Sequence, residues 1–376
     1  MLLAGCSVGL LVLGVALGGM AAAVECQELD RGGAIRLNQI QVIGTHNSYH
    51  AGFGPSEARL WQIKNLDAFN GIDYAHQPLK QQLDAGVRQI ELDIFADSQG
   101  GRFAHPAGPR MVAEAGLPPD PPFDPRGVMT QPGFKVMHVQ DIDYRSVCQP
   151  FVACLKEVRE WSHAHPHHIP IFILVETKRS SVEGAMQLTP AEPFTPAAFD
   201  ALDAEIRSVF QLRELITPDD VRGRYETLNQ AVLAGNWPTL ESARGKVVFL
   251  MDQQWAGPVY LEGHPSLRGR LLFTNATPGE PDAAFVELND GPAGEIEKLV
   301  RQGYLVRTRA DDSTREARSN DTHRRDAMLA SGAQIVSTDY PASEPARWEG
   351  HYSVSLPGDV SARCNPVNAP NGCGIE

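Results

Sequence analysis

The feature that most constrains the fold is a series of short, apolar, β-branched runs that alternate with segments of helical periodicity. Several runs are apolar on both faces, as strands covered by helices must be. Residues 151–161 and 199–210 carry apolar side chains at helical spacing between such runs. The pattern predicts a (β/α)₈ TIM barrel, either regular or distorted. Its eight predicted strands are Ile40–Ile43, Val87–Phe95, Lys135–Val139, Ile169–Val175, Lys246–Met251, Arg270–Thr274, Tyr304–Thr308 and Ala333–Thr338.

Two long segments interrupt the regular spacing. Residues 100–133 contain eight prolines and follow the second predicted strand, while residues 180–196 follow the fourth. Both therefore lie on the side of the barrel where strands end and active sites form. Long loops at this end are either lids and specificity walls or plain insertions, and the sequence leaves both open. No linker divides the chain, so residues 24–376 are predicted to form one domain with a cysteine-containing C-terminal tail.

The charge balance restricts the partners. The chain has 33 Lys and Arg against 46 Asp and Glu, a formal net charge of −13, and no basic run. Counterion-driven binding to nucleic acid is therefore not expected. An acidic surface is also repelled by anionic membranes, so any lipid chemistry must depend on a local site. No obligate protein partner is inferred.

The N-terminal residues have the pattern of a targeting segment. An apolar stretch from Val8 to Leu17 is followed by small residues up to Ala23. This predicts a signal peptide over residues 1–23 and a secreted or periplasmic protein, although the first residues lack Lys and Arg. The run from Leu3 to Cys6 resembles a lipoprotein box, but it precedes the apolar stretch, so lipid anchoring is less expected.

Cysteine spacing favours two short disulfide loops. The expected pairs are Cys148 with Cys154, and Cys364 with Cys373, which would leave Cys26 unpaired. Spacing alone does not fix connectivity, so free thiols remain the alternative.

Polar side chains stand at the ends of four consecutive predicted strands. Glu91 and Asp93 lie two residues apart and therefore share one face of the second strand. Asn47 follows the first strand, and Glu176 and Lys178 follow the fourth. Converging buried carboxylates require a partner, and an all-oxygen set suits Ca²⁺ or Mg²⁺. Alternatively, the acids pair with Lys178 or arginines in a structural network.

Two histidines accompany these acids. His46 follows the first strand and His138 ends the third. With a divalent ion, two imidazoles form the set needed for phosphodiester cleavage, in which one removes a proton and the other donates one. A further group before the fourth strand belongs to the opposite end of the barrel and is expected to be structural. It consists of His163, His165, His167 and His168.

These motifs resemble the phosphatidylinositol-specific phospholipase C superfamily, in particular its secreted bacterial calcium-dependent branch. The resemblance covers residues 40–178 and rests on His46-Asn47, Glu91-x-Asp93, His138 and Glu176 in that order. It implies that His46 is the general base and His138 the general acid. It also implies that Ca²⁺ is bound by Asn47, Glu91, Asp93 and Glu176.

The later strands match more weakly. Arg307 and Arg309 occupy positions where relatives contact the head group or close the barrel, and Lys178 either contacts the phosphate or pairs with a neighbouring acid. Glu176-Thr177-Lys178 is also reminiscent of glycerophosphodiester phosphodiesterases. Those enzymes carry a His-Arg pair where this chain has His46-Asn47, which disfavours that assignment.

The resemblance implies an enzyme that cleaves phosphatidylinositol at a membrane surface into diacylglycerol and a cyclic or opened inositol phosphate. Met111, Val112, Leu117 and Phe123 in the proline-rich segment are candidates for contact with lipid. One alternative is a glycerophosphodiesterase acting on deacylated lipids. A second is a catalytically inactive barrel that binds inositol phosphates or glycans, but such a barrel would usually have lost a histidine or an acid, and none is lost here.

Overall fold

The computed structural model describes residues 34–179 and 188–375. The predicted signal peptide, Cys6 and Cys26 lie outside the described residues, as does the first part of the segment 180–196.

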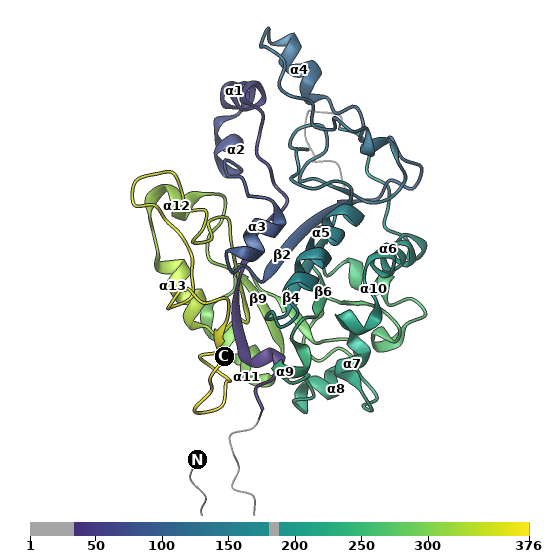
Figure 1. Cartoon of the computed structure of the whole chain (residues 1–376), viewed down its shortest axis with the longest axis vertical. Helices are drawn as coiled ribbons and strands as arrows, with labels where there is room; N and C mark the ends of the chain where they lie inside the picture. Colours follow the sequence, from purple (N-terminus) through teal and green to yellow (C-terminus); the bar gives the residue numbers. More distant parts are fainter. Residues whose placement is uncertain (1–33, 180–187, 376) are drawn as a thin grey trace, which may run out of the picture.

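A parallel sheet curls around the centre of the molecule and closes on itself (Figure 1). The strand order is β6-β4-β2-β1-β10-β9-β8, and β7 pairs with the other edge of β6. A parallel bridge between Asn275, just past β7, and Phe285 of β8 completes the ring. The ring strands are β1 (Ile40–Thr45), β2 (Gln89–Phe95), β4 (Ile171–Thr177), β6 (Val247–Met251), β7 (Leu272–Phe273), β8 (Phe285–Glu287), β9 (Leu305–Arg309) and β10 (Ile335–Thr338). The distorted TIM barrel predicted from the sequence is confirmed.

One predicted strand does not belong to this ring. Residues 135–139 contribute only β3 (Lys135–Val136), which pairs antiparallel with the end of β2. The proline-rich loop returns along β2 and forms a hairpin, with Met137 N donating to Asp93 O at 3.3 Å. A short apolar run has the same pattern in a hairpin as in a barrel strand, so periodicity could not separate the two. In the ring β2 pairs directly with β4, and the eighth strand is β8, which lies next to β9, is only three residues long and was not predicted.

Helices cover the outside of the sheet. The amphipathic helix α5 turns Leu155, Val158 and Trp161 to the core, and α6 does the same with Phe199 and Leu202. Each fully buried large apolar side chain contributes about 1.5–3 kcal/mol. The helices are α1 (Pro55–Lys64), α2 (Leu66–Gly71), α3 (Leu79–Asp84), α4 (Gly108–Glu114), α5 (Phe151–Ala164), α6 (Pro196–Val209), α7 (Pro218–Arg222), α8 (Leu228–Leu233), α9 (Leu240–Ala243), α10 (Ala256–Tyr260), α11 (Ala293–Gln302), α12 (Arg315–Ser319) and α13 (His323–Ala330).

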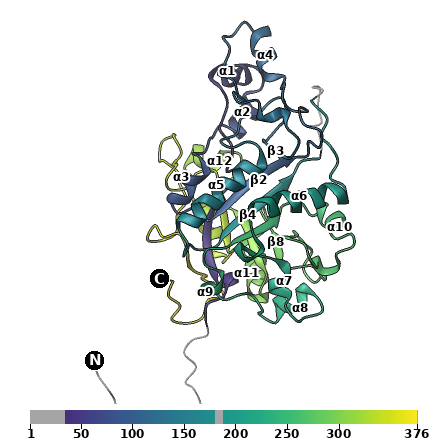
Figure 2. The same ribbon diagram turned by 45° about the vertical axis from the view of Figure 1, so that its right-hand side comes forward.

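Helices α1, α2 and α4 extend beyond one end of the barrel, where β1 and β2 end (Figures 1 and 2). The apolar residues expected to be exposed there are not: Val112 is buried, and Met111, Leu117 and Phe123 are half-buried. Phe123 packs edge-on against Tyr144, with ring centroids 4.9 Å apart. Because the proline-rich segment has its own small core, its apolar side chains face inward. The exposed apolar side chains at this end are instead Ile63 and Leu66, which are 69% and 54% exposed.

Both predicted disulfides are present, Cys148–Cys154 and Cys364–Cys373. The first joins the loop after β3 to α5. The second closes the tail that follows β11 (Arg363–Cys364), a strand antiparallel to β1. A further short strand, β5 (Leu215–Ile216), lies parallel to β6. Within the described residues, no helix is both long and apolar enough to span a membrane.

Candidate active site

Three carboxylates predicted as metal ligands meet at the mouth of the barrel. Glu91 and Asp93 come from β2 and Glu176 from β4, and one oxygen of each lies within 4.8 Å of the others. The register of the parallel strands brings them together, because Asp93 and Glu176 are paired directly across β2 and β4. The ammonium of Lys178 lies 2.7 Å from Asp93 Oδ2 and 2.6 Å from Glu176 Oε1. Lys178 thus forms the predicted ion pairs.

The electrostatics of this cluster favour an additional cation. Burial raises the pKa of Glu91 to about 7, against the opposing effect of Arg307. Burial and the neighbouring Glu176 also raise the pKa of Asp93. Burial would raise the pKa of Glu176 as well, but Lys178 more than offsets it and the pKa is lowered. Two of the three acids are therefore disfavoured as anions, and a bound cation would relieve this.

The donor set fits Ca²⁺. In the part of the chain that the structure describes, Asp93 Oδ1 is buried and accepts no hydrogen bond. Asn47, the fourth predicted ligand, donates its amide nitrogen to Tyr74 Oη at 2.8 Å, and this leaves its Oδ1 available to a cation. The Tyr49 hydroxyl donates a long hydrogen bond of 3.4 Å to that oxygen. Carboxylate and amide oxygens are the ligands that Ca²⁺ prefers.

Arg307 is part of the support of this cluster. Its side chain is 1% exposed and contacts Glu91, Glu287 and Asn289, with Nη1 2.8 Å from Glu287 Oε1. The predicted contact of Arg307 with a head group would therefore involve a buried guanidinium that is already bound to two carboxylates. Sequence reasoning missed Glu287 because β8 is so short. It also missed Asp252, although that acid directly follows β6; burial and Glu287 raise its pKa.

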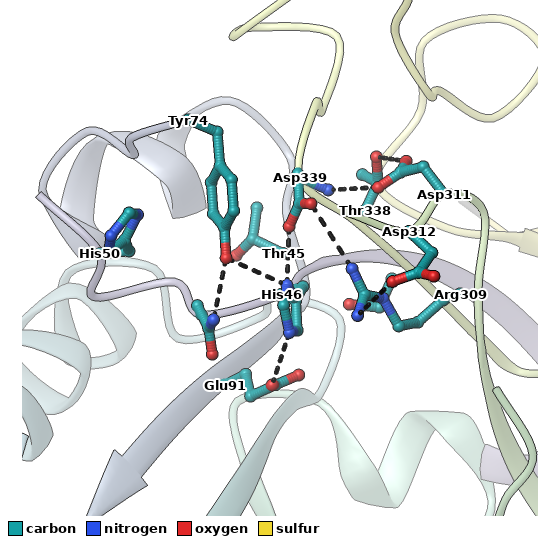
Figure 3. A network of polar contacts seen from close by, with 12 residues as sticks. Thr45, His46, His50, Tyr74, Glu91, Arg309, Asp311, Asp312, Thr338 and Asp339 are labelled. Carbon is teal, nitrogen blue, oxygen red and sulfur yellow. Dashed lines mark hydrogen bonds and ion pairs between the residues drawn. The ribbon is translucent and has the colours of Figure 1, made fainter. Parts of the chain in front are cut away.

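His46 is held by a buried acid beside this cluster (Figure 3). Its Nδ1 lies 2.7 Å from Asp339 Oδ1, and its Nε2 lies 3.6 Å from Glu91 Oε1. Tyr74 Oη is 3.2 Å from the same Nδ1. Arg309 Nη2 lies 3.5 Å from Asp339 Oδ2. Burial and Arg309 lower the pKa of His46 to about 3, while the pKa of Asp339, which burial would raise, is lowered to about 2 by His46 and Arg309.

His138 has an equivalent support. Its Nδ1 lies 2.8 Å from Asp143 Oδ2, and the fully buried His50 places its Nε2 2.9 Å from each oxygen of the same carboxylate. Burial would raise the pKa of Asp143, but His50 and His138 hold it well below its usual range. Asp143 and His50 were missed by sequence reasoning. The available signal was weak: an acid five residues after His138, in a turn.

The four histidines at 163, 165, 167 and 168 lie around the end of α5. The His165 ring stacks on Trp161 at 4.2 Å, and His163 contacts Glu214. His168 is buried, with Nε2 2.7 Å from the Ser162 hydroxyl. They lie apart from the two supported imidazoles, as the sequence predicted.

A parallel barrel whose mouth carries two carboxylate-held imidazoles beside a buried cluster of oxygen ligands defines an enzyme that combines acid–base chemistry with a divalent cation. The family comparison gives the same class. Residues 35–366 match the family described as phosphoinositide phospholipase C, Ca²⁺-dependent, and the chain belongs to this calcium-dependent family of phosphodiesterases. The predicted resemblance is confirmed.

Solved structures agree on the fold. The apo form of the calcium-dependent phosphoinositol-specific phospholipase C from a Pseudomonas species has a TM-score of 0.52 and 17% identity, covering 88% of this chain and 95% of that one. The Ca²⁺-dependent enzyme from Streptomyces antibioticus has a TM-score of 0.50 and 19% identity, covering 81% and 95%. At such identities the likeness shows the fold alone. No curated protein matches the sequence.

Proposed function

We propose that this enzyme cleaves phosphatidylinositol into diacylglycerol and a cyclic inositol phosphate, which water can then open. The observation that carries the proposal is the pair of imidazoles, each held by its own acid, next to one cluster of oxygen ligands. His46 Nε2 lies 3.6 Å from Glu91, and His138 is near enough to Glu176 to contribute to the lowering of the pKa of that acid. A phosphate bound at the cluster would then have a histidine on each side.

His46 is the proposed general base. Asp339 occupies its Nδ1, so Nε2 is the atom that takes the proton from the inositol 2-hydroxyl. His138 is the proposed general acid, with Nδ1 held by Asp143 and Nε2 left to donate a proton to the departing glycerol oxygen. When bound by Asn47, Glu91, Asp93 and Glu176, Ca²⁺ neutralises charge on the phosphate and lowers the pKa of the hydroxyl.

Three cations complete the proposed site. Lys178 orients Asp93 and Glu176 through its ion pairs with both carboxylates. Arg307 fixes Glu91 from below. Arg309 is the best placed to reach a head group, because its side chain is 12% exposed and already lies beside the Asp339–His46 pair.

The substrate is proposed to be taken from a membrane surface outside the cytoplasm. Ile63 and Leu66 are exposed beyond the barrel mouth, where they can enter a lipid interface. Two disulfides favour an oxidising compartment, which supports a secreted or periplasmic enzyme.

One assay tests the substrate and the ion. Purified protein is incubated with phosphatidylinositol, phosphatidylcholine or glycerophosphoinositol in Ca²⁺, Mg²⁺ or EGTA, and products are identified by phosphorus NMR. We expect cyclic inositol phosphate from phosphatidylinositol in Ca²⁺ alone. Preferred turnover of glycerophosphoinositol would instead support the glycerophosphodiesterase alternative.

A second assay separates the two histidines. The contribution of a general acid to the rate grows as the leaving group becomes poorer. Diacylglycerol is a poor leaving group, whereas p-nitrophenol is a good one. His138→Ala should lose about 10²-fold or more on phosphatidylinositol and be largely rescued on a p-nitrophenyl inositol phosphate. His46→Ala should be impaired on both, because the attacking hydroxyl is the same. Rescue of His46→Ala alone would reverse the two roles.

A further inference from the structure

A cavity of about 250 Å³ lies between α1, α4 and the stretch that follows α4. Its walls are largely aliphatic: four prolines at 109, 119, 121 and 122, together with Val112 and Phe123. Val112 is 2% exposed and forms part of the floor, while the four prolines are exposed at the rim. The walls can accommodate apolar chains and offer few hydrogen-bonding groups.

The charged groups of this cavity are already paired. Glu57 is 2% exposed and accepts from Arg145 Nε at 2.6 Å and from the Tyr144 hydroxyl. Asp120 accepts the backbone N–H groups of Ser56 and Glu57, each at 2.9 Å. Arg145 donates to Glu57 through Nε and Nη2. Within the described residues, its Nη1 has no acceptor. The cavity therefore suits an uncharged, aliphatic ligand that carries a hydrogen-bond acceptor at one end.

The cavity adjoins the general-acid side of the site. Asp143 holds His138, and the next two residues, Tyr144 and Arg145, reach Glu57 in the cavity. The start of α4 is fixed to the same turn, because Gly108 N donates to the Asp141 carbonyl at 2.9 Å. The wall of the cavity and the support of His138 are thus one continuous segment.

The geometry of the reaction determines which part of the substrate lies on the His138 side of the site. In-line displacement puts the attacking and departing oxygens on opposite sides of phosphorus. His138 protonates the departing oxygen, so the glycerol and its acyl esters lie on the His138 side. The inositol ring lies on the side of His46.

From this placement, we propose that the cavity binds the first part of one acyl chain of the lipid, with Arg145 Nη1 donating to the ester carbonyl. The proposal rests on the proposed function and adds the recognition of the leaving group. It differs from contact with a bilayer, because a cavity of this kind would also accept the chain of a lipid dissolved as a monomer.

The test uses phosphatidylinositols with chains of four to eight carbons, each below its micelle concentration. Burial of one methylene corresponds to about fourfold in affinity. We therefore expect kcat/KM to rise by up to about fourfold per added carbon and then to level off when the cavity is full. Turnover that does not vary with chain length would overturn the proposal while leaving the proposed function intact.

Two variants block the cavity from different sides. Val112→Phe fills the floor, and Pro121→Trp covers the rim without altering the core. Each should flatten the chain-length dependence and leave hydrolysis of p-nitrophenyl inositol phosphate unchanged, with folding checked by circular dichroism. If Pro121→Trp folds and retains the wild-type dependence, the chain binds elsewhere.

A surface variant distinguishes binding in the cavity from contact with the membrane. Ile63→Ser should lower turnover on phosphatidylinositol vesicles and retain the chain-length dependence on monomers. If Pro121→Trp instead impairs vesicles only, the prolines contact the bilayer and the acyl site is refuted. No hydrolysis of any inositol phosphodiester would remove the proposed function, and the acyl site with it.

Discussion

Replacing Glu91 by Gln should stabilise the metal-free protein and remove its response to calcium. Burial raises the pKa of Glu91 from its ordinary 4.5 to about 7, with Glu287 adding to the effect and Arg307 opposing it. For an acid whose folded pKa is raised, stability falls as pH rises from the unfolded value through the folded one. At pH 8 the ionised carboxylate therefore costs about 3 kcal/mol, at about 1.4 kcal/mol per pKa unit.

Glutamine removes this charge and retains much of the geometry. Its amide oxygen can still accept from Arg307, which also keeps Glu287 and Asn289 as partners. Since a neutral acceptor bonds Arg less strongly than a carboxylate, the net gain in EGTA should be about 1–3 kcal/mol. In contrast, Ca²⁺ at 100 times its dissociation constant stabilises the wild type by about 2.7 kcal/mol. The variant has lost a charged ligand and should gain much less.

Urea unfolding followed by tryptophan fluorescence at pH 8 measures both effects. In EGTA the free energy of unfolding should be higher for Glu91→Gln than for wild type, and Ca²⁺ should reverse or close that difference. Glu57→Gln is the matched control, because Glu57 is equally buried and paired with an arginine outside the cluster. It should destabilise the protein in both conditions. A Glu91→Gln protein that is weakened in EGTA, or that keeps the wild-type calcium response, would refute the reasoning.

Three further outcomes follow from the structure. Lys178→Met should destabilise the EGTA form, because two buried carboxylates lose their partner, and should tighten Ca²⁺ binding measured by calorimetry, since a competing cation is gone. Burial lowers the pKa of His168 to about 4, so stability should fall as pH drops from 6.5 towards 4, by up to about 3 kcal/mol, and His168→Gln should flatten that slope in urea titrations. The double variant Ile63→Ser, Leu66→Ser should bind phosphatidylinositol vesicles several-fold more weakly in sedimentation while hydrolysing monomeric substrate normally.

The sequence was most informative where strand register alone decides position. Glu91 and Asp93 share a face because side chains alternate along a strand, and Glu176 meets them because parallel strands end at the same edge. His138, which was expected to end a barrel strand, instead follows the short strand of a hairpin. A sequence pattern can identify a strand, but it does not show which strand pairs with it. For this reason the prediction that residues 135–139 form a barrel strand was wrong.

The supporting residues were harder to predict because their positions depend on tertiary contacts. Asp143 lies in a turn after β3, and its role follows only from the packing of His50 and His138 around it. Glu287 stands at the end of a strand too short to show periodicity. The orientation of the apolar residues in the proline-rich loop could not be predicted either, since a side chain such as Phe123 gives the same sequence pattern whether it faces lipid or packs against a small core.

The charge balance of the mouth explains why these supports belong with a divalent ion. In the described part of the chain, four buried or half-buried acids contact or adjoin two cations, of which Arg307 is buried and Lys178 half-buried. The acids are Glu91, Asp93, Glu176 and Glu287. With the acids ionised, the cluster carries a charge of −2, which one Ca²⁺ neutralises. Burial and Glu287 also raise the pKa of a fifth acid, Asp252. The two cations thus reduce the repulsion among the acids, and we expect the charge that they leave uncompensated to favour calcium binding. A third cation would make the metal-free protein more stable at the expense of binding, and for this reason stability and calcium affinity should change in opposite directions across variants of this cluster.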